Sequence, residues 1–133
     1  MSRSLVTPLA LLLGLFALAN GVSMSVSPEP WYWAAAGVPD RGPFNQHFIR
    51  DIGFIYLLIG TSLLYGTVYS EHRFYIWMLP ALWLVLHAIF HIWEVLVGIC
   101  GPESLLEDFV GVTLPGLVSL WLLYFSYQRP ERV

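Results

Sequence analysis

Three ionisable side chains, His87, His91 and Glu94, lie in one of the most apolar stretches of the chain, WLVLHAIFHIWEVLVGI. Their offsets of four and three residues place them on one face of a helix. Imidazole and carboxylate groups bind transition metals, and a carboxylate that is left free can accept a proton. Because ionisable groups are costly inside a membrane-spanning helix, such a cluster indicates a functional site.

A second pair, His47 and Asp51, stands just before the apolar run IGFIYLLIG and also shares a helical face. We expect this pair to approach the first cluster from a neighbouring helix. The predicted metal ligands are His47, Asp51, His87, His91 and Glu94, with Glu107 or Asp108 as additions. Imidazoles and carboxylates without a thiolate favour one Zn, Cu or Fe ion over Ca or Mg. Helical bundles hold metals with inward side chains of these types.

A structural interpretation accounts for the same residues. The two histidines and Glu94 would then bond to one another or to backbone carbonyls, and Arg50 would pair with a nearby acid to fix helix register. Further along the chain, Glu107 and Asp108 follow Ser104 and Glu103, where acidic residues favour a helix N-terminus. We assign these acids to capping, with Ser104 as the cap residue.

The elements that carry these residues are four apolar spans, predicted near 5–26, 45–69, 74–99 and 105–127. Each is long enough to cross about 30 Å of hydrocarbon, which needs roughly 20 residues. The first span also resembles a cleaved signal peptide, with an Ala17-Leu18-Ala19 site, but its apolar run continues to Val26 and favours an uncleaved helix. The predicted fold is a single all-α membrane domain over residues 1–133, a four-transmembrane-helix bundle.

Proline and glycine positions predict the details of this bundle. The Pro- and Trp-rich segment 27–44 is expected to be a loop that can contain a short re-entrant or surface helix around 30–36. Pro43 is expected in the first turn of the second span, with Asp40 or Gly42 near its cap. Pro80 and Pro115 are expected to kink the third and fourth spans. Glycines spaced six or seven residues apart in the second span, Gly53, Gly60 and Gly66, predict a close helix approach.

Composition supports a membrane protein and excludes other classes. Only 11% of the residues are charged, whereas a soluble domain is closer to about one quarter. All six basic residues are Arg and none form a basic run, which argues against nucleic-acid binding. A single cysteine, Cys100, excludes an internal disulfide. Arginine counting favours an N-in, C-in orientation, with Arg3, Arg73, Arg129 and Arg132 inside and Arg41 and Arg50 outside.

The stretch GPFNQHFIRDIGFIYLLIG, followed by a span with H-x-x-x-H, resembles a group of uncharacterised bacterial four-helix integral membrane proteins. This likeness covers roughly residues 31–127 and implies a bacterial inner (plasma) membrane location. The number and length of the spans are also similar to those of DoxX-like membrane proteins. Neither resemblance implies a catalytic residue.

Three functions follow from these observations. The first is a membrane protein that binds a transition metal and that would, as an enzyme, act on a lipophilic substrate. The second is a non-catalytic subunit of a larger respiratory or photosynthetic membrane complex, or a homo-oligomer, in which the polar cluster is structural. The third is a proton relay through His87, His91 and Glu94, which we rank last because no ionisable residues continue the path toward the inner face.

Overall fold

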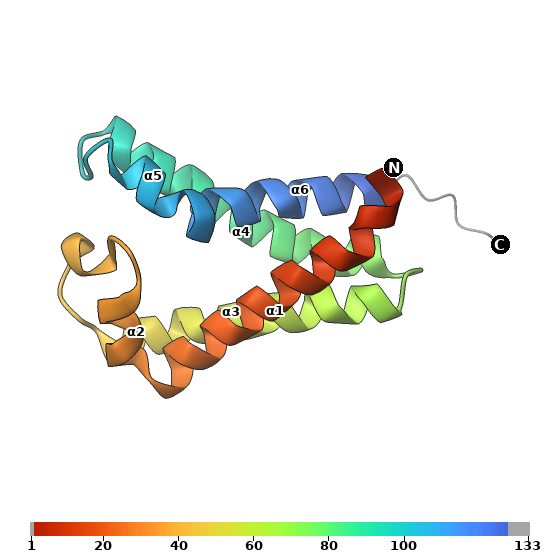
Figure 1. The fold of residues 1–133 in the computed structure, drawn as a ribbon, viewed down its shortest axis with the longest axis horizontal. Helices are drawn as coiled ribbons and strands as arrows, with labels where there is room; N and C mark the ends of the chain where they lie inside the picture. Colours follow the sequence, from red (N-terminus) through yellow and green to blue (C-terminus); the bar gives the residue numbers. More distant parts are fainter. Residues whose placement is uncertain (1, 128–133) are drawn as a thin grey trace.

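A computed structural model describes residues 2–127 and is helical throughout its regular elements (Figure 1). Four segments are long and apolar enough to cross a membrane. They are α1 (Val6–Val26), α3 (Gln46–Val68), α4 (Arg73–Leu96) and a composite segment from Ser104 to Tyr127 that contains α5, η3 and α6. The four predicted spans are therefore confirmed to within a few residues.

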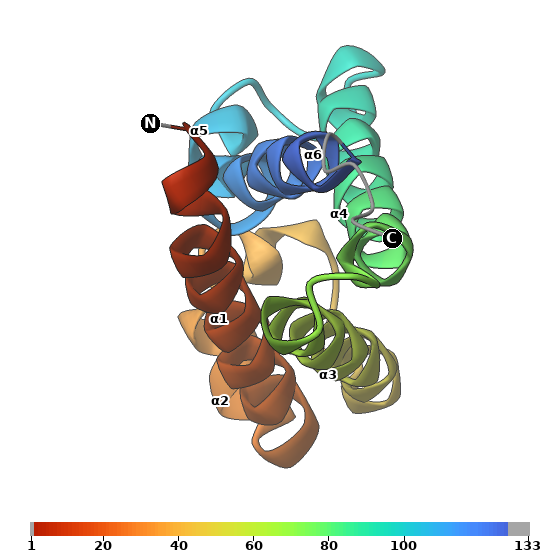
Figure 2. The same cartoon turned by 90° about the vertical axis from the view of Figure 1, so that its right-hand side faces the viewer.

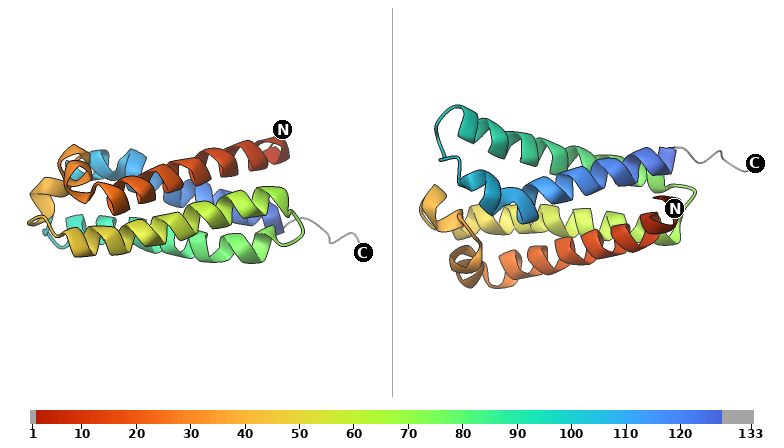
Figure 3. Two further views of the ribbon diagram at one scale, coloured as in Figure 1. Left: turned by 90° about the horizontal axis from the view of Figure 1, so that it is seen from below. Right: turned by 45° about the horizontal axis from the view of Figure 1, so that its top comes forward.

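The long helices form two pairs that separate toward one end of the molecule. Helix α1 packs along α3, and α4 packs along α6 (Leu114–Tyr127). The pairs approach one another where α1 begins and α6 ends, and they diverge toward the end that carries α2, η2 and α5 (Figures 1 and 3). We call this second end the loop end, and the opposite end, where α3 turns into α4, the turn end.

Glycines allow the close contact between α1 and α3. A Cβ atom added at Gly21 would lie 2.7 Å from the carbonyl oxygen of Gly53, and one at Gly60 would lie 2.8 Å from the carbonyl oxygen of Gly14. These distances are too short for any other residue, so the two backbones touch directly. The close approach predicted for the glycines of the second span is confirmed, and α1 is its partner.

The turn end is held by hydrogen bonds from α4 to backbone carbonyls of α3. The indole Nε1 of Trp77, which is fully buried, donates to the carbonyl oxygen of Leu63 at 3.1 Å. The Nε of Arg73 donates to the carbonyl oxygen of Gly66 at 3.1 Å, and its guanidinium lies 5.0 Å from the Trp77 ring centre. These contacts bring the two helix pairs together at this end.

At the loop end, the chain between α1 and α3 folds into two short elements, α2 (Pro28–Ala34) and η2, a 3-10 turn (Val38–Arg41). Seen from the turn end, this connection lies behind the space between the helix pairs (Figure 2). Helix α3 begins only at Gln46, because the side chain of Asn45 accepts hydrogen bonds from the amides of His47 and Phe48. The prediction that Pro43 lies in the first turn of this helix, with Asp40 or Gly42 near its cap, is therefore wrong.

The last span is not one regular helix. It begins with α5 (Ser104–Asp108), continues as the π-helical segment η3 (Phe109–Thr113) and becomes α6 at Leu114. Pro115 has no amide hydrogen, so it cannot complete the hydrogen-bond ladder of the preceding turn, and the irregular segment lies there. By contrast, α4 continues through Pro80 as one helix. Ser104 makes no capping hydrogen bond, so its predicted role is wrong.

Candidate binding cavity and its polar network

The divergence of the helix pairs leaves a cavity of about 970 Å³ at the loop end. Its walls come from α1, α2, α3, α4, α5 and η3, and the segment around η2 borders it as well. Most of the lining is aromatic or aliphatic, including Phe16, Trp31, Ile52, Tyr56, Trp83, Leu86 and Phe90. Polar side chains also contribute, and these are His87, His91, Glu94, Asn20, Asn45, Arg41, Glu107 and Asp108.

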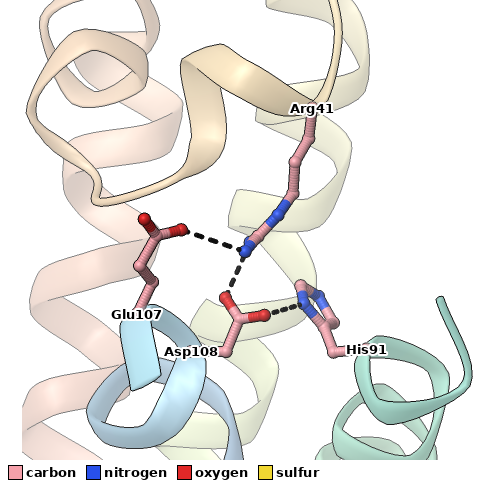
Figure 4. A network of polar contacts seen from close by, with 4 residues as sticks. All are labelled: Arg41, His91, Glu107 and Asp108. Atoms are coloured by element: carbon pink, nitrogen blue, oxygen red, sulfur yellow. Dashed lines mark hydrogen bonds and ion pairs between the residues drawn. The ribbon is translucent and has the colours of Figure 1, made fainter. Parts of the chain in front are cut away.

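Four of these polar side chains form one network, which we call the Asp108 network (Figure 4). Nη1 of Arg41 donates to Oδ1 of Asp108 at 2.7 Å. Oδ2 of Asp108 lies 2.8 Å from Nδ1 of His91. Nη2 of Arg41 also reaches Oε2 of Glu107 at 3.5 Å. Asp108 is thus the centre, because each of its two carboxylate oxygens has a separate partner.

Three elements far apart in the sequence place these side chains. The turn η2 ends at Arg41, α5 ends at Asp108, and His91 lies in the last turns of α4. Gly37, with φ at 71°, lets the chain turn into η2 while passing directly against the carboxylate of Glu107. The network therefore bridges the helix pairs where they are furthest apart.

Burial makes this network electrostatically significant. The side chain of Asp108 is 7% exposed, that of His91 is 14% exposed and that of Arg41 is 17% exposed. Burial lowers the pKa of Arg41, but the hydrogen bond and negative charge of Asp108 outweigh it, so the pKa is raised above its ordinary value. Arg41 is therefore a permanent cation whose charge is neutralised within the network.

The same geometry fixes how His91 presents its ring. A carboxylate only accepts hydrogen bonds, so Nδ1 of His91 must carry a proton toward Asp108. In the neutral imidazole, Nε2 is then the acceptor. The ring of His87 lies 4.6 Å from that of His91, at 78°, and stacks on Trp83 at 6.1 Å. His87 makes no side-chain hydrogen bond with any residue between 2 and 127.

Glu94 is the remaining predicted ligand on α4. It lines the cavity and is half-buried, three residues beyond His91. Within the described part of the chain, its carboxylate has neither a hydrogen-bond donor nor a cation as a partner.

The structure does not bring His47 and Asp51 into this site. They pair with each other, with Nε2 of His47 at 3.4 Å from Oδ2 of Asp51, and their side chains are 89% and 57% exposed. The opposite face of α3, with Ile49 and Gly53, is the buried one, so both polar side chains point away from the bundle. The predicted convergence of this pair on His87 and His91 is therefore absent.

No group of three or more His, Cys, Asp or Glu side chains within residues 2–127 is arranged to hold a metal ion. Among the same residues, the predicted ion pair of Arg50 with an acid is not formed. Instead, Arg50 donates to the carbonyl oxygen of Ser25 and to the side chain of Gln46.

Sequence reasoning missed the two charges at the centre of the network. Arg41 entered only the count of basic residues, and Asp108 was assigned mainly to helix capping. The sequence did contain two signals. Asp108 directly precedes an apolar run, where an acid needs a partner, and Arg41 is one of only two arginines expected at the outer end of the bundle. Their separation by 67 residues hid the pairing.

No family model, curated protein or solved structure matches the chain. The resemblance to bacterial four-helix membrane proteins remains a prediction, and the function is inferred from the cavity and the Asp108 network.

Proposed function

We propose that the protein is an integral membrane protein that binds a lipophilic small molecule in the cavity, with a polar group of that molecule next to His87 and His91. One observation carries this proposal: a cavity of about 970 Å³ has mainly apolar walls and a few polar side chains that converge from different elements. This combination is typical of small-molecule sites, which are largely apolar with few orienting polar groups.

Exposed apolar residues at the edges of the cavity support access from the bilayer. Phe48 of α3 and Phe90 of α4 both line the cavity and are at least half exposed. On the other side, Phe16 of α1 and Val110 of η3 also combine exposure with a place in the lining. A lipophilic molecule could therefore exchange between helices without crossing a polar surface.

The Asp108 network supports a fixed polar end within this site. Because Asp108 orients the His91 ring, the acceptor Nε2 of His91 is held ready for a hydrogen-bond donor of the bound molecule. His87 offers a second imidazole beside it. Arg41 is already bonded to two carboxylates, so we assign it a role in holding the site together.

The proposal is tested by extracting small molecules that co-purify with the full chain and identifying them by mass spectrometry. The comparison uses wild type, His91→Ala and, as a matched control, His47→Ala, because His47 is a largely exposed histidine near the same end. We expect a lipophilic molecule retained by wild type and His47→Ala and depleted in His91→Ala. Identical profiles for all three proteins would contradict the proposal.

A second candidate function is transition-metal binding, here of Zn, Cu or Fe, by His87 and His91. It is supported by the bond between His91 and Asp108, because metal-bound histidines commonly donate their other nitrogen to a carboxylate. Glu94 or a bound molecule would complete the ligand set. Element analysis should then find metal in wild type and in His47→Ala/Asp51→Ala, but not in His87→Ala/His91→Ala. Equal, negligible metal in all three proteins would exclude it.

We further propose that the loop end lies outside a bacterial inner membrane, with both termini inside. Four arginines against two support this orientation. A single-cysteine test is direct, because Cys100 is the only cysteine. In a Cys100→Ser background, an impermeant maleimide added to intact cells should label Glu103→Cys at the loop end and not Glu71→Cys at the turn end. The reverse labelling would invert the proposed topology.

A further inference from the structure

We infer that the molecule bound in the cavity is a lipophilic cation, such as a protonated amine with apolar substituents. This inference rests on the proposed binding function and assigns the class of its ligand. It follows from the charges and the aromatic groups that border the cavity.

The cavity has an excess of negative charge. When His87 and His91 are neutral, the three carboxylates that line it, from Glu94, Glu107 and Asp108, face the single guanidinium of Arg41. The positive charge of Arg41 is already shared between Asp108 at 2.7 Å and Glu107 at 3.5 Å. An anionic head group would therefore find no free cation among the described lining residues and would face unneutralised carboxylates.

Of the three carboxylates that line the cavity, only that of Glu94 has no partner among residues 2–127. It is half-buried in the lining, and no described residue donates a hydrogen bond to it or pairs with its charge. A carboxylate in such a position is costly unless a cation lies beside it. A bound cation would compensate its charge from inside the cavity.

Aromatic rings complete the argument. Trp31, Tyr32, Trp83 and Phe90 line the same cavity as Glu94. Aromatic faces attract cations through their electron density, and they also pack against apolar substituents. Carboxylate and aromatic groups together are the chemistry that recognises a lipophilic onium ion.

The experiment compares two probes of nearly the same shape and opposite charge, tetraphenylphosphonium and tetraphenylborate, with neutral triphenylphosphine oxide as a third. Binding to the full chain in a non-ionic detergent is measured by equilibrium dialysis against protein-free micelles. We expect tetraphenylphosphonium to bind at least about tenfold more tightly than tetraphenylborate, since about 1.4 kcal/mol of charge interaction corresponds to a factor of ten.

Variants of Glu94 test whether its charge causes the preference for the cationic probe. Glu94→Gln should reduce tetraphenylphosphonium binding by about tenfold and leave the neutral probe unchanged. Glu94→Asp, which keeps the charge, should retain much of the preference. Glu71→Gln is the matched control, because Glu71 is an exposed glutamate at the turn end, far from the cavity. It should bind as wild type does.

The outcomes separate the two proposals. If the neutral probe or tetraphenylborate binds as tightly as tetraphenylphosphonium, the cation inference is overturned while the binding cavity stands. If none of the probes binds and His91→Ala retains the same co-purifying molecules as wild type, both proposals fail. Should Glu94→Gln fail to fold, the comparison of probes on wild type and Glu94→Asp still decides the inference.

Discussion

The substitution Asp108→Asn removes the charge at the centre of the network while it nearly preserves the shape of the side chain. The wild-type carboxylate makes hydrogen bonds of 2.7 Å to Arg41 and 2.8 Å to His91. Hydrogen bonds to charged groups contribute about 1.5–3 kcal/mol each. An amide keeps one acceptor oxygen, and Arg41 keeps Glu107 as a partner, so we expect unfolding to become easier by about 2–4 kcal/mol.

A double-mutant cycle assigns this loss to particular contacts. Arg41→Gln combined with Asp108→Asn should give a coupling energy of about 1.5–3 kcal/mol, because both groups are largely buried. Arg41→Gln combined with Glu107→Gln should give only about 0–1 kcal/mol. The side chain of Glu107 is 40% exposed and lies 3.5 Å from the guanidinium, so solvent weakens that pair.

The assay is reversible unfolding in mixed micelles of a non-ionic detergent and sodium dodecyl sulfate, followed by circular dichroism at helical wavelengths. Free energies come from linear extrapolation for each variant. Equal coupling of Arg41 with Asp108 and with Glu107 would refute the assignment of Asp108 as the centre of the network. So would a loss below about 0.5 kcal/mol for Asp108→Asn, which is typical of a neutral surface change.

Two further predictions concern the fold, and a third concerns the exposed pair His47 and Asp51. Gly21→Ala should reduce the free energy of unfolding by about 1–3 kcal/mol in the same assay, because the added Cβ overpacks against the backbone of α3. Gly111→Ala is the control and should be close to neutral, because its added Cβ meets no atom within 4 Å. Equal effects of the two substitutions would contradict the direct backbone contact. Trp77→Phe should cost about 1–3 kcal/mol, because it removes the indole hydrogen bond to the carbonyl of Leu63 and leaves space where the larger buried ring was packed. A shift smaller than that of an exposed Trp33→Phe control would argue against this bond. His47→Ala/Asp51→Ala should change the free energy of unfolding by no more than about 0.5 kcal/mol, because the pair is exposed. The double variant should also retain the same co-purifying molecules as wild type. Loss of those molecules would show that the pair belongs to the site.

The sequence was sufficient for the spans because long apolar runs carry the information on membrane crossing by themselves. The second span, predicted at 45–69, agrees with α3 (Gln46–Val68) to within one residue at each end. Its cap was expected near Asp40 or Gly42, with Pro43 in the first turn. The structure places the cap at Asn45 instead, because the side chain of Asn45 turns back onto the first amides of the helix. The cluster on α4 was also visible in the sequence, because its spacing repeats the helical period.

The partners of that cluster could not be derived in the same way. The pair His47 and Asp51 satisfied the same spacing rule, yet a rule within one helix does not say which face of that helix packs inward. Gly53 and Gly60 decide this, because they bring the opposite face of α3 against α1. Arg41 lies in a loop without periodicity, so only the three-dimensional arrangement reveals its bond to Asp108.

The bond between Arg41 and Asp108 also bears on how the protein is made. A ribosome delivers the chain from its N-terminus, so α1, α3 and α4 are available to the membrane before Asp108 is synthesised. Until then, Arg41 and His91 lack their common partner, because Asp108 follows Arg41 by 67 residues and His91 by 17 residues. Insertion of the fourth span is therefore the step that completes the cavity, and a chain that stops after α4 would hold three spans without a site.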